Sequence, residues 1–388
     1  MKILYISHST AWDGSGIALY NMMAYMINQN HEVNLITPKE TGKLIDQAVS
    51  LGVKIWCIPR YGLTIWPSLT TPLRFIKRTL SLILHNRKAK QELYNVLISV
   101  SPDIVHTNVG PLDIALENCT KLGIPHVWHL REYQDKDFGM FFLPSKNQFI
   151  KRILKKGNFN IAITKDIFNY WHLRPGVDKV IYDGVFSSQL LPHHPQEKKN
   201  YILFTGRVEP AKGVDVAIEA FALYVHKYKN SKTSLLIAGQ QYLGSRYQSY
   251  CNELIKKNSL QERVLFLGNR SDIYTLMAEA QCMIVASRFE GFGFITVEAM
   301  LNHCLVIGRM TGGTKEQIDE GINKMGFPIA LKFNTVEECA EMIYVALTGE
   351  HKDMQTAAYE MVTSSYTNEI YGKNIEEYYY SIINNPNI

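Results

Sequence analysis

A chain of 388 residues is long enough for two domains, each with its own hydrophobic core. With 46% hydrophobic and 20% charged residues, the composition excludes a disordered or fibrous protein. The six cysteines form no C-x-x-C pair, so they indicate neither a zinc site nor a disulfide framework, and we expect a reducing compartment. The apolar run within the N-terminal MKILYISHST is too short for a signal peptide, so we expect a first strand there. No run reaches the ~18 apolar residues of a membrane-spanning helix. We therefore expect a cytoplasmic protein, soluble or peripheral on the inner face of a membrane.

The net charge of +5 conceals an asymmetry between the two halves of the chain. Up to Pro195 there are 22 Lys plus Arg against 14 Asp plus Glu, and from Gln196 onward the counts are 19 and 22. Solvated helix faces would explain this excess. An anionic acceptor or a peripheral contact with an anionic membrane would also explain it, because Leu80, Ile83 and other apolar residues lie among the basic ones. No aromatic-and-basic module is visible, so nucleic acid is not expected as a partner. The basic residues form two clusters: Arg74, Lys77, Arg78, Arg87, Lys88 and Lys90; and Lys146, Lys151, Arg152, Lys155 and Lys156.

Strand-like apolar runs alternate with helical patterns along the whole chain, which is typical of βαβ units and a parallel sheet. The first series of expected strands is Ile3–Ser7, Val33–Thr37, Lys54–Ile58, Ile104–Thr107, His126–Leu130, Ile161–Thr164 and Val180–Tyr182. The second is Tyr201–Thr205, Ser234–Ala238, Val264–Leu267, Met283–Ala286 and Leu305–Ile307. Between them, residues 191–200 contain two prolines and no periodicity, and we interpret them as a linker. The expected domains are 1–192 and 193–365, followed by a tyrosine-rich helical segment, 366–388.

Two features of the first half are candidate site elements. The turn after the first strand holds Asp13, Gly14, Ser15 and Gly16, without the G-x-G-x-x-G spacing of a dinucleotide-binding loop. His129 lies at the end of the strand in HVWHLRE, where it could contact a sugar hydroxyl, although a structural histidine is the simpler interpretation of one such residue. Asp135 and Asp137 form a D-x-D pattern, which arises often by chance, and a metal site there is not favoured.

The second half contains three strand-to-helix turns rich in glycine and charge. In YILFTGRVEPAKGVD (residues 201–215), Arg207 supplies a forked donor and Lys212 a compact charge, a suitable pair for a diphosphate. In RFEGFGFITVEAM (288–300), a glycine turn leads into a helix whose first N–H groups suit a phosphate. Glu298 lies eight residues after Glu290, about two turns further at roughly 3.6 residues per turn. It could accept hydrogen bonds from sugar hydroxyls, although two ordinary glutamates on a solvent-facing helix would fit this spacing equally well. The third turn is TGGTKE (311–316).

These motifs together resemble the signatures of retaining family 4 glycosyltransferases of the GT-B fold, which use nucleotide-sugar donors. The resemblance is strong from about residue 200 to 320 and looser elsewhere. It implies an α/β fold of two Rossmann-like domains facing across a cleft, with a last helix that crosses back to the first domain. It places Glu290 by the donor sugar, the glycine turn by the distal phosphate and Glu298 by the ribose, with Arg207 and Lys212 gripping the phosphates.

The resemblance also assigns His129 to the donor sugar and the turn of the first domain to the donor phosphate. The acid that many members carry directly after this histidine is replaced here by Leu130, which puts any role for Glu132 in doubt. The catalytic set is therefore Glu290, His129, Arg207 and Lys212. The substrate-binding set is Gly14, Ser15, Gly16, Gly291, Phe292, Gly293 and Glu298.

The implied reaction is retaining transfer of a hexose-type sugar from a nucleotide diphosphate to an acceptor hydroxyl, with no metal or other cofactor. A saccharide or lipid-linked acceptor in cell-surface polysaccharide or glycolipid synthesis is expected from the family and the basic first domain. Two alternatives remain. A nucleotide-sugar epimerase of the same fold would act without an acceptor, and a non-catalytic partner would keep the fold without turnover.

Overall fold

The computed structural model describes residues 1–67, 71–189, 197–229 and 232–385. Its contacts divide the chain into two units. Unit 1 comprises Met1–Gly184 together with Asn368–Ile388, and unit 2 comprises Val185–Thr367. The expected linker at 191–200 lies largely outside the described residues. In the described part of the chain, no helix has both the length and the hydropathy to cross a membrane.

Unit 1 is built on a seven-stranded parallel sheet in the order β3-β2-β1-β5-β6-β8-β9. The strands are β1 (Lys2–Ser7), β2 (Glu32–Thr37), β3 (Lys54–Cys57), β5 (Ile104–Asn108), β6 (His126–Leu130), β8 (Asn158–Ala162) and β9 (Lys179–Val180). The central strands are almost wholly buried, since helices cover both faces of such a sheet. The strand order reverses between β1 and β5, which pair with each other in parallel. A separate antiparallel pair joins β4 (Ile65–Pro67) to β7 (Met140–Phe142).

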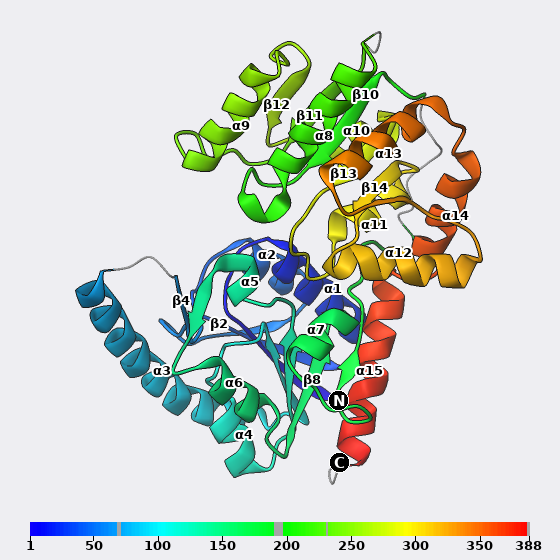
Figure 1. The fold of residues 1–388 in the computed structure, drawn as a ribbon. Helices are drawn as coiled ribbons and strands as arrows, with labels where there is room; N and C mark the ends of the chain where they lie inside the picture. The colour runs from blue at the N-terminus through cyan, green and yellow to red at the C-terminus, as the bar shows by residue number, and fades with distance from the viewer. Residues whose placement is uncertain (68–70, 190–196, 230–231, 386–388) are drawn as a thin grey trace. The chain divides into compact units, whose positions relative to one another are not determined.

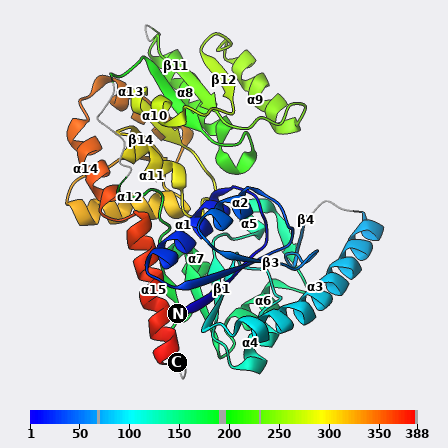
Figure 2. The ribbon, with the colours of Figure 1, turned by 180° about the vertical axis from the view of Figure 1, so that it is seen from behind.

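The helices of unit 1 include one that comes from the far end of the sequence. The helix α15 (Asn368–Asn384) packs against α1 (Gly14–Asn28), as Figures 1 and 2 show. Its Tyr371, Tyr378 and Tyr379 are buried in the same cluster as Ile3 and Met22. The expected return of the last helix to the first domain is therefore confirmed. The other helices of the unit are α2 (Lys43–Ser50), α3 (Pro72–Val100), α4 (Leu116–Leu122), α5 (Asp135–Phe138), α6 (Lys146–Ile153) and α7 (Lys165–Tyr170).

Unit 2 is built on a six-stranded parallel sheet in the order β12-β11-β10-β13-β14-β15. The strands are β10 (Tyr201–Thr205), β11 (Ser234–Ala238), β12 (Val264–Gly268), β13 (Cys282–Val285), β14 (Leu305–Arg309) and β15 (Leu331–Phe333). The helices are η1 (Pro210–Lys212), α8 (Val214–Lys227), α9 (Arg246–Lys257), α10 (Ile273–Glu279), α11 (Phe294–Leu301), α12 (Gly312–Met325), α13 (Val336–Thr348) and α14 (Lys352–Thr363). Both units are Rossmann-like, as the alternating pattern predicted.

Three strands escaped the sequence analysis and one was placed too late. The strands β4, β7 and β15 have three residues each, too few to produce a recognisable alternation. The strand expected at 161–164 is β8, which begins at Asn158. Its two asparagines obscured the apolar run, yet both are buried and bonded: Asn158 to the His126 ring at 2.9 Å, and Asn160 to Asp178 at 2.9 Å.

Candidate functional site

The candidate site of unit 2 lies where the strand order of its sheet reverses. From β10 the sheet grows toward β11 and β12 on one side and toward β13, β14 and β15 on the other. Loops that leave the carboxyl ends of such neighbouring strands diverge, and ligands bind in the crevice they leave. The motif with Arg207 and Lys212 follows β10, and the motif with Glu290 follows β13. The two motifs, 78 residues apart from Lys212 to Glu290, thus meet at one edge of the sheet.

Lys212 and Glu290 are in direct contact at this edge. The Nζ atom of Lys212 lies 2.9 Å from Oε2 of Glu290, and both side chains are mostly buried, at 22% and 12% exposure. The approach depends on Gly213, which starts α8 with a φ of +72°. A Cβ atom at this position would lie 2.1 Å from the carbonyl oxygen of Ala286, at the end of β13. Only glycine allows the turn to pass so close to the neighbouring strand.

Arg207 points to a different partner from Lys212. Its guanidinium lies 2.9 Å from the carboxylate of Glu209, and its side chain is 46% exposed. The structure therefore joins Lys212 to Glu290 but leaves Arg207 at the rim, paired with a neighbour. An exposed ion pair of this kind contributes little to stability, so Arg207 is available for exchange to an incoming anion.

The loop from Glu290 to Gly293 is held between two helix starts. Gly293, with a φ of +91°, precedes α11, and the Gly313 N–H in the first turn of α12 donates to the Glu290 carbonyl oxygen at 2.8 Å. A Cβ on Gly312 would lie 2.2 Å from that same oxygen. The Gly-Gly pair of TGGTKE is therefore a close packing surface for the Glu290 loop, and it brings the positive ends of two helix dipoles to that loop.

Phe292 differs in role from its two glycine neighbours. Its side chain is only 2% exposed, and its ring packs edge-on against Phe294 and Tyr366, at 5.2 and 5.5 Å between centroids. The carbonyl oxygen of Phe292 accepts a hydrogen bond from the Gln317 side chain at 2.7 Å. The aromatic ring thus anchors the loop in the core of unit 2, and any ligand contact of Phe292 would come from its backbone.

Glu298 lies on α11, two turns beyond the loop. Its Oε1 accepts a hydrogen bond from the Tyr274 hydroxyl of α10 at 3.2 Å. Burial raises the pKa of the Glu298 carboxyl, against the smaller opposing effect of that hydrogen bond. Tyr274 is 53% exposed and was not singled out in the sequence, where a tyrosine on an amphipathic helix carries no distinguishing signal.

A second ion pair, missed in the sequence, fixes the turn that carries Lys212. Arg288 donates to both carboxylate oxygens of Asp215, at 2.9 and 2.6 Å, and to the carbonyl oxygen of Pro210 at 2.5 Å. Tyr247 adds a hydrogen bond to Asp215 at 2.7 Å. Burial opposes ionisation of Asp215, but the hydrogen bonds from Arg288 and Tyr247 outweigh it and lower its pKa. Arg288 is the first residue of the motif 288–300 and follows a strand closely, so its charge at that position could have indicated a role at the site.

The glycine turn of unit 1 is tethered at the corresponding reversal of its own sheet. Asp13 caps α1 by accepting from the Gly16 N–H at 3.0 Å and from the Ser15 hydroxyl at 2.8 Å. A Cβ on Gly16 would lie 2.5 Å from the Ala11 carbonyl oxygen. At the end of β5, Asn108 donates to the Ser15 carbonyl oxygen at 3.1 Å. Gly14 is exposed and Ser15 is half-buried, so the start of the turn presents its backbone at the carboxyl edge.

His129 lies inside unit 1 and is fully buried. Its Nδ1 is 3.2 Å from Nε2 of His106 and 3.4 Å from an Arg131 nitrogen that can only donate, so Nδ1 accepts and Nε2 carries the proton. That Nε2 has no hydrogen-bond partner among the described residues. Burial, with Arg131 and His106 nearby, holds the pKa of His129 well below its usual value. His129 is therefore a neutral imidazole with its N–H buried inside unit 1.

Arg131 connects the strand β6 to both segments where the chain passes between the two units. It donates to Asn108 at 2.8 Å, to Asp183 at 2.6 Å and to the Tyr371 hydroxyl at 3.0 Å. Asp183 directly precedes Gly184, where the chain leaves unit 1 for unit 2, and Tyr371 is in the first turn of α15, where the chain has returned. This buried ion pair is thus a structural tie beneath the site edge, and no sequence pattern indicated it.

Two further titratable residues stand at this edge of unit 1. His8 directly follows β1, and burial lowers its pKa. Glu132 follows β6, and burial, with Asp137 adding to it, raises the Glu132 pKa from 4.5 to about 7. His8 was not singled out in the sequence, although its place directly after the first strand was a usable signal.

The D-x-D residues are engaged by their neighbours. Asp135 is bonded to Lys146 at 3.3 Å and to the Tyr170 hydroxyl, and Asp137 accepts from the Tyr133 N–H at 2.8 Å. Over the described ranges, no group of three or more His, Cys, Asp or Glu side chains is arranged to hold a metal ion.

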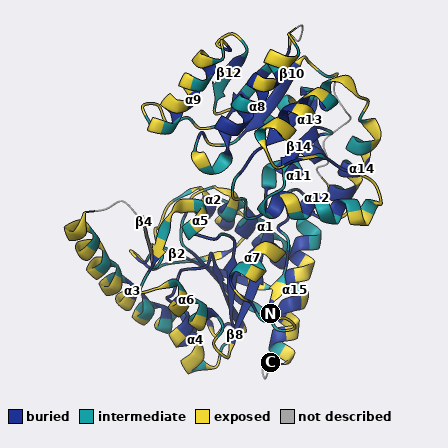
Figure 3. Cartoon of the chain, viewed as in Figure 1, coloured by how far each residue is buried: buried dark blue, intermediate teal, exposed yellow. Residues whose placement is uncertain are grey.

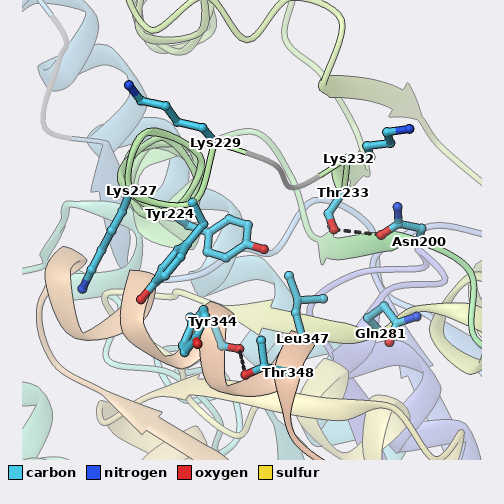
Figure 4. Close-up of a pocket in the computed structure, with 11 residues that line it drawn as sticks. Asn200, Tyr224, Lys227, Lys229, Lys232, Thr233, Gln281, Tyr344, Leu347 and Thr348 are labelled. Carbon is cyan, nitrogen blue, oxygen red and sulfur yellow. Dashed lines mark hydrogen bonds between the residues drawn. The ribbon is translucent and has the colours of Figure 1, made fainter.

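A pocket of about 650 Å³ lies at the opposite, amino-terminal edge of the unit 2 sheet (Figure 4). The pocket is lined by the residues that directly precede three strands: Asn200 before β10, Thr233 before β11 and Gln281 before β13. Tyr224 and residues of α13 complete the lining. Three lysines surround it, but Figure 4 shows their amino groups directed away from one another. They do not converge on a common anion, and the pocket is remote from the motif residues.

Comparisons with known proteins agree on one family. The model "Glycosyltransferase Family 4" matches residues 12–188 and "Glycosyl transferases group 1" matches residues 190–361. An uncharacterised glycosyltransferase of Methanocaldococcus jannaschii, MJ1178, is 28% identical over 241 residues, covering 59% of this chain and 62% of that protein. The N-acetyl-alpha-D-glucosaminyl L-malate synthase of Bacillus anthracis is 22% identical over 254 residues, covering 62% and 64%. The chain thus spans less than two thirds of the length of these relatives.

A solved structure extends the likeness to the whole chain. The crystal structure of Anabaena Alr3699/HepE in complex with UDP and glucose has a TM-score of 0.74 and 20% identity, over 98% of this chain and 100% of that one. At this identity the likeness establishes the fold. With family models over both units and a likeness of fold to a solved structure over 98% of its length, the chain belongs to the family 4 glycosyltransferases of GT-B fold.

Proposed function

We propose that the protein is a retaining glycosyltransferase that moves a hexose-type sugar from a nucleoside diphosphate to an acceptor hydroxyl. The observation that carries the proposal is the Lys212–Glu290 pair at the strand-order reversal of unit 2, flanked by two helix starts. A cation, an anion and two helix dipoles gathered at one sheet edge suit a ligand with both a diphosphate and sugar hydroxyls.

In the proposed donor complex, the diphosphate replaces carboxylates as the partner of both cations. Lys212 exchanges Glu290 for the donor phosphates, and Arg207 exchanges Glu209 for them. Glu290 is thereby released to accept hydrogen bonds from the donor sugar. Glu298 accepts from the ribose, with Tyr274 orienting its carboxylate.

The bond changes of the proposed reaction need no separate strong base. The acceptor oxygen forms a bond to the anomeric carbon as the bond from that carbon to the phosphate oxygen breaks. The diphosphate leaves with the electron pair, and its oxygen takes up the acceptor proton. Lys212, Arg207 and the helix starts stabilise the charge that develops on the leaving group.

We assign to unit 1 the neutral His129, as a hydrogen-bond donor to the sugar, and the Gly14–Gly16 turn, as a phosphate contact. The Anabaena structure, which contains UDP and glucose, makes uridine diphosphate sugars the first donors to test. For the acceptor we propose a saccharide or lipid-linked saccharide of cell-surface polysaccharide or glycolipid synthesis, used on the cytoplasmic side.

The proposal is tested by incubating the protein with UDP-, GDP- and ADP-hexoses, each with and without a chelator, and resolving the products by chromatography and NMR. We expect slow release of free sugar from one donor class, unaffected by chelator. When an acceptor is found, the anomeric configuration of the donor should be kept. A new nucleotide sugar formed from the donor alone would instead identify an epimerase. Absence of any product or binding with all donors would identify a non-catalytic partner.

A further inference from the structure

The helix α3 presents a second apolar face in addition to the one that packs on unit 1. Its C-terminal half is anchored by side chains that are at most 7% exposed: Asn86, Ala89, Leu93, Leu97 and Val100. Its N-terminal half carries five large aliphatic residues that are between 54% and 82% exposed: Leu73, Ile76, Leu80, Ile83 and Leu84. Figure 3 shows exposed residues along this helix, and Figures 1 and 2 show its first turns extending away from the sheet of unit 1.

The two sets lie on different sides of the helix. At 3.6 residues per turn, the five exposed aliphatic residues fall within an arc of about 100°. The anchored residues fall in an arc centred roughly 130° away. The exposed stripe is therefore a distinct face, not the edge of the packed one. Its first and last residues, Leu73 and Leu84, are about 17 Å apart along the helix axis at 1.5 Å per residue.

The charge beside this face has one sign. Residues 72–91 contain six basic residues and no Asp or Glu. Arg74, Lys77 and Lys88 fall on the sector that borders the aliphatic stripe, and all three are exposed. Lys88 is paired with Glu92 at 3.6 Å, which leaves Arg74 and Lys77 as the cations of this sector nearest the start of the helix. The complementary partner is therefore anionic as well as apolar.

The second basic cluster does not offer a comparable surface. Within it, Lys146 is paired with Asp135 at 3.3 Å, and Arg152 is paired with Asp113 at 2.5 Å. These cations serve contacts inside unit 1, and α6, which carries them, has no exposed aliphatic stripe.

We propose that the N-terminal half of α3 is an interfacial anchor that lies in the headgroup region of an anionic bilayer. A stripe of Leu and Ile with no aromatic residue, bordered by Lys and Arg, fits a lipid surface. A protein partner would favour aromatic anchors and few lysines. The aliphatic side chains enter the upper acyl region while the long basic side chains extend to the phosphates. This inference does not depend on the proposed function, since it rests on α3 alone.

The test is vesicle flotation of the full chain with phosphatidylglycerol-containing and pure phosphatidylcholine vesicles. We expect wild type to bind the anionic vesicles at least tenfold more tightly, with binding weakened by salt. The Arg74→Gln/Lys77→Gln double variant should lose roughly 25-fold, at about fivefold per basic side chain near the surface. The Ile76→Gln/Leu80→Gln double variant should lose at least tenfold.

Two matched controls are available in the same chain. The Lys155→Gln/Lys156→Gln double variant removes the same charge from exposed positions elsewhere in unit 1, and Leu223→Gln removes an exposed leucine from unit 2. Both should bind within about twofold of wild type. Equal loss in the lysine control would reduce the effect to net charge and overturn the proposal. Unchanged vesicle binding by both α3 variants would also overturn the proposal. The same holds if the variants lose only self-association, because α3 would then be a contact between copies of the chain. Because α3 is not part of the donor site, nucleotide-induced thermal stabilisation should persist in every variant, which separates this test from that of the proposed function.

Discussion

The carboxylate of Glu298 illustrates how one side chain is prepared for a ligand by its surroundings. Among the described residues this carboxylate accepts one side-chain hydrogen bond, from Tyr274, and burial raises its pKa. A ligand hydroxyl would supply a hydrogen bond in place of those that burial prevents water from making. Glu290 is the contrasting case, since its carboxylate already has a cationic partner in Lys212. The two glutamates are therefore expected to respond differently to a nucleotide.

We predict that Glu298→Gln reduces the preference for ribose. The wild-type protein should bind its preferred nucleoside diphosphate about 10- to 100-fold more tightly than the 2′,3′-dideoxy analogue, because hydrogen bonds to a charged group contribute about 1.5–3 kcal/mol. Calorimetric titration should show that Glu298→Gln, whose amide makes only neutral hydrogen bonds, prefers the ribose form by less than about tenfold. The control Tyr274→Phe keeps the carboxylate and should keep most of the preference. Full discrimination in Glu298→Gln would refute the ribose assignment.

A second residue-scale prediction concerns pH. The pKa of Glu132 is raised from 4.5 to about 7, so the folded state holds this proton more tightly than the unfolded state. Its contribution to stability is complete at low pH and is lost as the pH rises through this interval. Glu132→Gln should therefore match wild type near pH 4 and exceed it near pH 8 by on the order of 1–3 kcal/mol in urea unfolding. An exposed-site control, Glu253→Gln, should show no such gain. Equal stabilisation at both pH values would contradict the burial of this carboxyl.

At the scale of elements, the site edge of unit 2 depends on glycines that let loops approach strands. Gly213 combines a positive φ with a backbone oxygen 2.1 Å from where a Cβ would be, whereas Gly326 has a φ of +65° with open space around it. The two positions share the conformational requirement but differ in the steric one. They form a matched pair within one domain.

We predict that Gly213→Ala is much more costly than Gly326→Ala. The latter should lower the free energy of unfolding by about 1 kcal/mol, the usual cost of a left-handed conformation for a residue with a Cβ. Gly213→Ala adds a backbone clash, so it should cost about 3 kcal/mol or more, and it should also weaken nucleotide binding by moving Lys212. Thermal unfolding with and without nucleotide measures both effects. Equal costs at the two positions would show that the close approach to Ala286 is not a constraint.

For the whole molecule, unit 1 is completed by a helix from the C-terminal end of the chain, and Arg131 ties that helix to the sheet. Replacing Arg131 by Met leaves Asp183 buried without its cation, which should cost about 3–5 kcal/mol. The double variant Arg131→Met/Asp183→Asn should recover part of this loss because no unpaired charge remains. Hydrogen exchange should show the loss in both β6 and α15. Protection lost in β6 alone would show that the tie does not hold the last helix.

The sequence predicted the architecture because parallel strands buried on both faces leave long apolar runs, as in β1 and β10. It also predicted the motif residues of unit 2, since glycine turns at strand ends are local patterns, and the structure brings Lys212 and Glu290 together. It could not predict contacts between segments far apart in the chain. Arg131 with Asp183 and Tyr371, and Arg288 with Asp215, depend on tertiary packing that no local spacing encodes. The burial of the Phe292 ring could not be predicted for the same reason.

The central claim is that the donor diphosphate binds at the edge shared by β10 and β13. The most direct measurement is the dissociation constant of UDP, GDP and ADP for wild type, Lys212→Met and the exposed control Lys256→Met. We predict that one nucleotide binds, that Lys212→Met weakens it by about 10- to 100-fold through loss of a charge-assisted contact, and that the control is unchanged. Undiminished binding by a folded Lys212→Met protein would contradict the account.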